Sequence, residues 1–403
     1  MSAGILAGMR VVEISAFVAA PLGGMTLAQM GAEVIRIDGL NGGLDYHRWP
    51  VTADNTSLFW AGLNKAKRSV AIDINKPQGR ELAQALITAP GDDAGLLLTN
   101  FPDRGWLDYE TLRGQRSDLI QLTIQGDRHG GSAVDYTVNP RLGLPYLTGP
   151  QGGCDAVNHV LPAWDLITGQ MAAVGLLAAE RQRRRDGTGQ QVKLALEDVA
   201  LAVMGHLGFL AEAQLGQQRQ RHGNNLFGAF GRDFVTADGQ RIMLVGLTLK
   251  QWRSLCEVTG VSQQVQALAE RLGVNLDHEG QRFHARDALA ELIGPWVAAR
   301  SLEEITAIFE ASGVCWSRYQ SVATLLAEDP SCSEQNPLFR QLAHAGIGNL
   351  LTPGLPLRFA EQYRPPQIAP QLGADTEAVL MEVLGLSSSE FGALHDQGLV
   401  RTA

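Results

Sequence analysis

Short apolar runs alternate with amphipathic segments along the first half of the chain. The apolar runs are rich in Val, Ile and Leu, which is typical of strands in a buried parallel sheet. The amphipathic segments between them are predicted helices, because prolines such as Pro21 and Pro77 begin them and Gly31 ends one. A strand, a helix and a strand within about thirty residues form a parallel βαβ unit, so we predict an α/β fold. The predicted strands occupy residues 9–15, 33–38, 68–74, 95–99, 119–125 and 190–197.

The carboxyl ends of these strands define the expected ligand-binding edge, because doubly wound sheets bind ligands there. Residues 15–19, Asp38, 72–73 and 100–101 would share this edge. The turn after the first strand, AFVAAPLGGM, lacks the fingerprint GxGxxG. NAD or FAD binding is therefore not expected, and capping a turn is an ordinary role for Asp38.

The segment 158–197 carries the strongest candidate chemistry. Asp165 follows a tryptophan at the start of a long apolar helix, for which we predict burial, and arginines at 181–185 close that helix. Two roles for Asp165 stay open on spacing alone. One is to cap the helix by accepting backbone N–H groups. The other is to attack an activated acyl group as a carboxylate nucleophile.

The second half of the chain predicts a smaller α+β domain and a return to the first one. A hairpin is expected around Asp238-Gly239, followed by helices as far as Ser312. A proline-rich stretch then reads as an extended crossing, and two helices close the chain. We place the first part of a large domain at 1–216, the small domain at 217–329 and the return segment at 330–403.

Composition excludes several classes of protein. The chain has 403 residues, of which 45% are apolar and 19% charged, as in globular proteins with a large core. A net charge of −9 argues against general binding to nucleic acid or anionic membranes. No run is long enough to span a bilayer, and the N-terminus lacks a signal-peptide pattern. The widely spaced Cys154, Cys256, Cys315 and Cys332 indicate free thiols in the cytoplasm and no zinc site.

Several stretches, in order along nearly the whole chain, resemble the family III CoA-transferases, which include formyl-CoA transferase and α-methylacyl-CoA racemase. Each stretch is modest, but their order and spacing make the match specific. They are GMRVVEIS, MGAEVIRID, NKAKRSVAIDI, the TNF at 99–101, the WD at 164–165, GLLAAERQRRRDGTGQQVKLALED, and APQLGADTEAVLMEVLGLSSSEFGALHDQGLV.

The resemblance implies a Rossmann-like large domain, a small domain and an interlocked homodimer. It places Asp165 at the family's nucleophilic aspartate, which favours the nucleophile over the cap. It implies no separate cofactor or metal, since CoA is part of the substrate. The CoA-binding positions, mostly through backbone groups, would be Ala16, Phe17, Val18, Ala19, Ile72, Asn100 and Phe101.

Departures from the family pattern narrow the activity. Racemases carry a histidine where this chain has Val134, which disfavours a racemase and leaves Asp135 as a possible assisting residue. The glutamine of formyl-CoA transferases falls at Val18, and a basic residue common after the second strand falls at Gly39. Stretches such as GGLDYHRWPVT, NHVLPAWD and GAFGRDF resemble the branch whose members move CoA between the two carboxyl groups of one dicarboxylate.

A dicarboxylate substrate needs a cation or N–H groups for its free carboxylate. Arg48, Arg141 and Arg232 are the candidates, with His47, His222 and Asn224 as further possibilities. A solvated surface charge is the alternative for each arginine. Three other activities stay open: CoA transfer to a separate acid, racemisation of a 2-methylacyl-CoA, and acyl-CoA binding without catalysis.

Overall fold

The computed structural model describes residues 4–403, and contacts divide the chain into two compact units. Unit 1 comprises residues 4–142, Val160–Gln214 and Asp329–Ala403. Unit 2 comprises Gly143–His159 and Leu215–Glu328. The segment 143–159, which we had assigned to the large domain, therefore belongs to the smaller unit.

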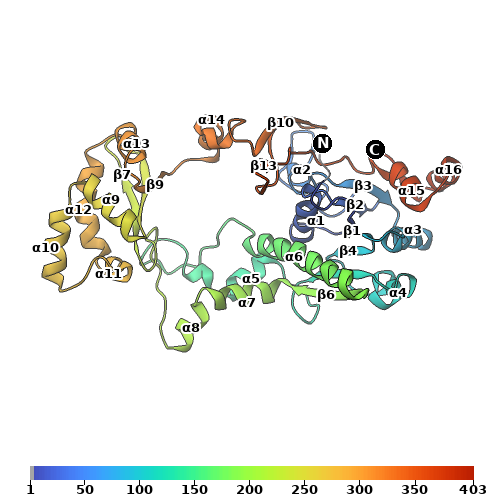
Figure 1. Cartoon of the computed structure of the whole chain (residues 1–403), viewed down its shortest axis with the longest axis horizontal. Coiled ribbons are helices and arrows are strands. Elements are labelled where there is room, and N and C mark those ends of the chain that lie inside the picture. The colour runs from blue at the N-terminus through green and yellow to red at the C-terminus, as the bar shows by residue number, and fades with distance from the viewer. Residues whose placement is uncertain (1–3) are drawn as a thin grey trace. The chain divides into compact units, whose positions relative to one another are not determined.

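A seven-stranded sheet in the order β14-β3-β2-β1-β4-β5-β6 forms the centre of unit 1 (Figure 1). All neighbouring strands run parallel except the short edge strand β14, which is antiparallel to β3. The predicted parallel sheet is thus confirmed. The strands are β1 Arg10–Ile14, β2 Glu33–Asp38, β3 Arg68–Ile72, β4 Leu96–Thr99, β5 Ile120–Gln125, β6 Gln190–Ala195 and β14 Val400–Arg401.

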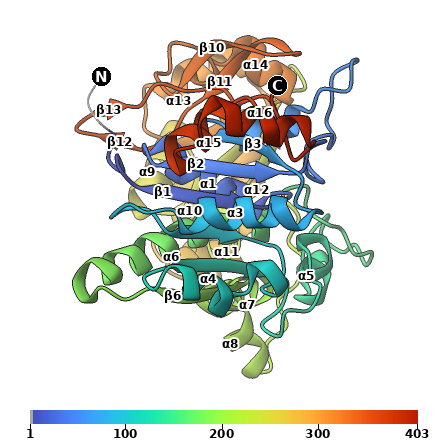
Figure 2. The same cartoon turned by 90° about the vertical axis from the view of Figure 1, so that its right-hand side faces the viewer.

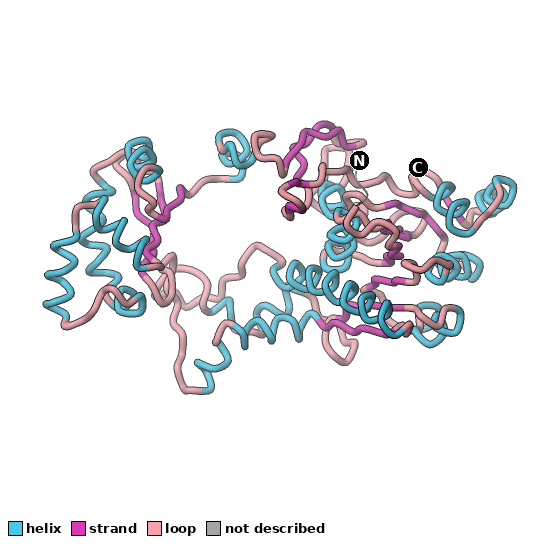
Figure 3. Tube along the Cα trace, viewed as in Figure 1, coloured by secondary structure: helices cyan, strands magenta, loops and turns pink. Residues whose placement is uncertain are grey.

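Helices cover both faces of this sheet, because successive strand residues point to opposite sides and both sides are apolar (Figures 2 and 3). Val11 and Leu98 face α1 and α6, whereas Val12 and Leu97 face the other helix layer. The first layer is α1 Ala19–Gln29 and α6 Ala163–Asp186; the second is α3 Pro77–Thr88, α4 Tyr109–Gln115, α15 Thr376–Leu384 and α16 Ser388–Asp396.

Helix α6 crosses the first turn of α1 at very close range. A Cβ added at Gly169 would lie 2.6 Å from the carbonyl oxygen of Ala19 and 3.0 Å from Cβ of Leu22. No side chain fits there, so glycine is what permits the approach. Asp165 precedes this crossing by one helical turn. The crossing therefore brings the N-terminal turns of α1 and α6 together.

The predicted burial of α6 is only partly correct. Leu176 is fully buried, but Ile167, Met171 and Val174 are 37%, 48% and 60% exposed. Their spacing of four and three residues places them on one stripe of the helix. At the other end Arg183 is buried and pairs with Asp118 at 3.3 Å, so this arginine anchors the helix rather than meeting solvent.

The remaining elements of unit 1 connect these layers. The return after residue 329, expected to be extended, contains an antiparallel hairpin of β10 and β11. The pattern missed it because its strands are largely exposed and carry no apolar alternation. The elements are α2 Leu58–Leu63, α5 Asp135–Arg141, α7 Leu196–His206, α8 Phe209–Gln214, β10 Phe339–His344, β11 Gly348–Pro353, β12 Arg358–Phe359 and β13 Gln362–Tyr363, with 3-10 turns at Gly105–Leu107 and Pro330–Cys332.

Unit 2 is an antiparallel three-stranded sheet packed against helices. Its first two strands form the predicted hairpin around Asp238-Gly239. The elements are β7 Phe230–Val235, β8 Arg241–Gly246, β9 Cys315–Arg318, α9 Leu249–Val258, α10 Ser262–Leu272, α11 Glu279–His284, α12 Arg286–Ala298, α13 Leu302–Glu310 and α14 Val322–Glu328, with a 3-10 turn at Leu144–Tyr146.

Across residues 4–403, no helix combines the length and the apolar character that crossing a membrane demands. The four cysteines carry free thiols. The cytoplasmic location stays a prediction.

Candidate active site

The carboxyl edge of the sheet in unit 1 opens into a pocket of about 420 Å³, which we call the Asp165 pocket. Its wall comes from the loop after β1, from Asn100 after β4, from the end of β5 and from the starts of α5 and α6. A pocket therefore lies at the edge of the sheet where we predicted ligand binding. It is lined by Ala16, Phe17, Val18, Ala19, Arg48, Phe59, Asn100, Ile124, Gln125, Gly126, Ala133, Val134, Asp135, Tyr136, Pro162, Asp165 and Leu196.

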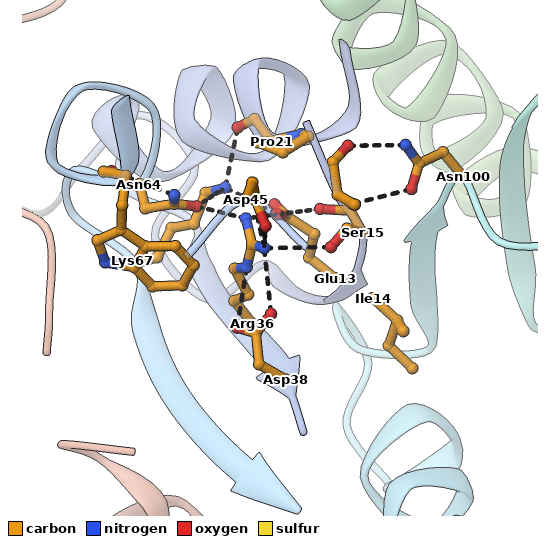
Figure 4. Close-up of polar contacts among 12 residues, drawn as sticks. Glu13, Ile14, Ser15, Pro21, Arg36, Asp38, Asp45, Asn64, Lys67 and Asn100 are labelled. Atoms are coloured by element: carbon orange, nitrogen blue, oxygen red, sulfur yellow. Dashed lines mark hydrogen bonds and ion pairs between the residues drawn. The ribbon is translucent and has the colours of Figure 1, made fainter. Parts of the chain in front are cut away.

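The loop after β1 is held in an unusual conformation. The side-chain amide of Asn100 donates to the carbonyl of Ala16 at 2.8 Å and accepts the Ala16 N–H at 3.0 Å (Figure 4). Phe17 follows with φ of 68°, a left-handed conformation that a non-glycine residue adopts only when neighbours enforce it. Helix α1 then begins at Ala19, and its N-cap residue Val18 provides no capping side chain. Its first N–H groups are therefore left for a ligand.

Asp165 is not the N-cap of α6. The helix begins at Ala163, after Pro162, so Asp165 lies inside its first turn. The capping role belongs to the buried Asp135 of α5, whose Oδ2 accepts the N–H groups of Trp164 at 2.7 Å and Asp165 at 3.3 Å. Within the described part of the chain, the Asp165 carboxylate itself accepts no hydrogen bond, so its oxygens are available for chemistry.

The surroundings of Asp165 make its carboxylate basic. Burial raises the pKa of Asp165 to about 7, the negative Asp135 adds to the rise, and Arg48 opposes it. The pKa of an aspartate in water is about 3.9. A buried carboxylate that accepts no hydrogen bonds is more basic, and hence a better nucleophile, than one in water.

Arg48 supplies the positive charge of the pocket. Its guanidinium lies 5.4 Å from the ring centre of Phe17 and 5.3 Å from that of Phe59. Among residues 4–403 no carboxylate forms an ion pair with it. It is also the one cation among the residues that line the pocket, so it is well placed to hold a carboxylate.

The other candidate cations are not among the residues that line the Asp165 pocket of unit 1. Arg141 is exposed and forms an ion pair with Glu197, outside the pocket wall. Arg232 belongs to unit 2, where it pairs with Asp287, and His222 and Asn224 belong to unit 2 as well. His47 lines a separate pocket of unit 1 beside Tyr46 and Trp60.

Two predicted CoA positions do not line the pocket. Ile72 is fully buried, and its backbone pairs with Val400 of β14. Phe101 packs against the core on the α3 side of the sheet. Conversely, Phe59, Tyr136 and Leu196 line the pocket but were not predicted, because an apolar residue at a pocket looks the same in sequence as one in a core.

Comparisons with known proteins agree with this geometry. Residues 6–376 match the model of CoA-transferase family III. The 2-methylfumaryl-CoA isomerase of Chloroflexus aurantiacus is 59% identical over 98% of both chains. Human succinyl-CoA:glutarate CoA-transferase is 25% identical over 98% of this chain and 90% of its own. The crystal structure of a CaiB/BaiF family protein from Brucella suis has a TM-score of 0.76 at 22% identity, covering 95% of this chain and 100% of that one, which shows the same fold.

Asp165 should take up a proton near pH 7. A water-soluble carbodiimide modifies protonated carboxyl groups, so labelling of the Asp165 peptide should disappear as pH rises through about 7, whereas ordinary aspartates stop reacting near pH 4. Asp135→Asn keeps an oxygen for the α6 cap but removes the charge that raises the Asp165 pKa, so its midpoint should move to lower pH. Peptide mass spectrometry measures both, and an Asp165 profile equal to that of exposed aspartates would refute the expectation.

Proposed function

This chain belongs to CoA-transferase family III, and we propose that it is an isomerase that converts 2-methylfumaryl-CoA into 3-methylfumaryl-CoA. The carrying observation is a hydrogen-bond-free Asp165 carboxylate in one pocket with the cation Arg48. The isomerase of Chloroflexus aurantiacus, 59% identical, supports the substrate. Such a substrate presents a thioester for a nucleophile and a free carboxylate for a cation.

The first step is attack by Asp165 on the thioester carbonyl. A new C–O bond forms, the C–S bond breaks, and CoA leaves as thiolate, giving a mixed anhydride between Asp165 and the acyl group. The carbonyl oxygen becomes negative in the transition state. The uncapped N-terminus of α1 at Val18 and Ala19, in the same pocket, is suited to hold that charge.

The later steps of the reaction transfer CoA to the other carboxyl group of the diacid. The thiolate attacks the Asp165 carbonyl of the anhydride, giving an aspartyl-CoA thioester and the free dicarboxylate. The other carboxylate of the diacid attacks this thioester and releases thiolate again. The thiolate then attacks the acyl carbonyl of the new anhydride, forming the isomeric ester and restoring the Asp165 carboxylate. Each step is acyl transfer between groups of similar activation, so the proposed sequence calls for neither metal nor redox cofactor.

Asp135 and Arg48 assist in different ways. Asp135 fixes the first turn of α6 and keeps Asp165 basic through its charge. Arg48 holds whichever carboxylate of the diacid is not reacting. The apolar side chains of Phe17, Phe59 and Val18 in the pocket wall help to keep water from the anhydride.

Racemisation is less well supported than CoA transfer. Exchange of an α-proton needs an acid and a base facing the substrate. The histidine nearest in sequence to Val134 is His129. It is exposed, hydrogen-bonded to Arg128, and absent from the pocket wall. The two carboxylates of the wall, Asp135 and Asp165, lie together at the start of α6.

We also propose that the chain forms a homodimer through the exposed stripe of α6. Ile167, Met171 and Val174 are joined by Leu201 of α7, which packs against α6. Exposed apolar side chains that gather on neighbouring helices often mark an interface. Light scattering should give a mass near twice 43.4 kDa, and Val174→Glu should reduce the mass to that of one chain. A single-chain mass for the unaltered protein would contradict the proposal.

Asp165→Ala should abolish isomerisation by a factor of at least about 10³ while CoA-ester binding stays within several-fold. The assay contains one purified CoA ester, no added acid, and chromatography of the products. Unaltered enzyme should form the isomer, whereas an intermolecular transferase would stall. Hydroxylamine trapping should place a hydroxamate on the Asp165 peptide. Turnover by Asp165→Ala would show that the nucleophile lies elsewhere.

Arg48→Gln should lower kcat/KM for the dicarboxylate ester by about 10- to 100-fold, because a hydrogen bond to a charged group contributes about 1.5–3 kcal/mol. An ester lacking the free carboxylate should lose much less. Arg141→Gln, an equal change outside the pocket, is the matched control and should stay within about twofold. An equal loss of kcat/KM in Arg48→Gln and Arg141→Gln would contradict the carboxylate-binding role of Arg48.

A further inference from the structure

A cluster of buried charges contacts the loop after β1, which contributes residues to the wall of the Asp165 pocket (Figure 4). It comprises three carboxylates and two cations, all nearly inaccessible to solvent: Glu13, Asp38, Asp45, Arg36 and Lys67. Ionised groups without solvent are costly unless each is paired and hydrogen-bonded. The proposed reaction uses none of these groups directly, so we looked for their role in the loops that they hold in place.

Arg36 is the centre of this cluster and is fully engaged. Its Nε donates to Asp38 at 3.0 Å and its Nη1 to Asn64 at 2.8 Å. Its Nη2 donates to Asp45 at 2.8 Å and to the carbonyl of Ser15 at 3.1 Å. The guanidinium also lies 4.4 Å from the ring centre of Trp60. A lysine could not make these contacts together, because only the planar guanidinium fork offers donors in several directions.

Through Nη2, Arg36 joins the two loops that carry pocket residues. Ser15 comes two positions before Phe17, and Asp45 comes three positions before Arg48. Phe17 and Arg48 meet in the pocket wall. One nitrogen atom therefore ties the loop after β1 to the loop between β2 and α2.

The path from Asp45 to Arg48 is short and continuous. The Arg48 N–H donates to the Asp45 carbonyl at 3.2 Å. On the far side, the Arg48 carbonyl accepts the hydroxyl of Ser57 at 2.6 Å. The backbone of Arg48 is thus held between Asp45 and Ser57, whereas its side chain rests only on two aromatic rings.

We propose that Asp45, clamped by Arg36, is a positioning residue that sets Arg48 where it meets the free carboxylate of the substrate. This inference rests on the carboxylate-binding role proposed for Arg48. Asp45 is not among the residues that line the Asp165 pocket. Losing its ion pair releases the loop between β2 and α2 from the sheet and lets the guanidinium of Arg48 move off the pocket.

Asp45→Asn is the primary test, because it keeps the shape and one acceptor oxygen but removes the ion pair. The cluster has one carboxylate more than it has cations, so neutralising one leaves no cation unmatched. We expect KM for the dicarboxylate ester to rise about tenfold or more, with the thermal midpoint within a few degrees of the parent. Asp54→Asn, the same change at an exposed position nearby, should alter neither.

A pH profile separates positioning from loss of stability. The titratable groups lining the pocket with Asp165 are Arg48, Asp135 and Tyr136, and Arg48 lowers the pKa of Asp165. If Arg48 moves away, the Asp165 pKa rises and the acid limb of kcat/KM shifts to higher pH. Asp45→Asn and Arg48→Gln should shift it in the same direction. A parent-like limb in Asp45→Asn overturns the proposal.

A double variant tests whether Asp45 acts through Arg48. If Asp45 acts through Arg48, then Asp45→Asn combined with Arg48→Gln should be no worse than Arg48→Gln alone, whereas additive losses would overturn the proposal. Ser57→Ala, which removes the other anchor of Arg48, gives the same cycle should Asp45→Asn not fold. Asp165→Ala runs in parallel. Turnover by Asp165→Ala would contradict the proposed function itself. An inactive Asp165→Ala together with parent-like kinetics of Asp45→Asn would contradict only the positioning role.

Discussion

The site depends on two backbone N–H groups at the start of α6 that bond to Asp135 instead of to Asp165. A helix N-terminus offers positive potential and free donors, and an acidic residue in the first turn ordinarily takes them. Here a second carboxylate, supplied by α5, takes them first. Asp165 thereby keeps its oxygens unbonded, and burial together with the like charge of Asp135 raises the pKa of its carboxyl group.

This arrangement requires two helices to begin at the same place. Parallel strands deliver both helix starts to one edge of the sheet, and Gly169 lets α6 lie against the first turn of α1. Asp165, the proposed nucleophile, and the uncapped N-terminus of α1 at Val18 then share one pocket. A larger residue at 169 would push the helices apart and separate Asp165 from the N–H groups at the start of α1.

The strands and helices of this structure can be predicted from the sequence more fully than its candidate site. Buried parallel strands are continuous apolar runs, and the ends of the helices are marked by Pro21 and Gly31; both signals are local, so they can be predicted. The cap on α6 comes from Asp135, thirty residues away, and spacing alone cannot show that these carboxylates meet. Resemblance to a family singled out Asp165, which lines a pocket in the structure, but only the fold distinguishes Arg48, which lines the same pocket, from Arg141, which does not.

The buried Arg36 had a visible signal in the sequence. A charged residue inside the apolar run EVIRID must be paired, yet its partners come from loops whose course the sequence does not specify. The structure shows why such a costly cluster is useful. Isomerisation requires one pocket to hold either end of a diacid in turn, so its cation must have no carboxylate of its own. Arg48, the cation we propose for this role, rests on Phe17 and Phe59. Because its side chain is held so weakly, its backbone must be fixed by other contacts. The charge pair of Arg36 and Asp45 provides that fixation where solvent cannot compete for it.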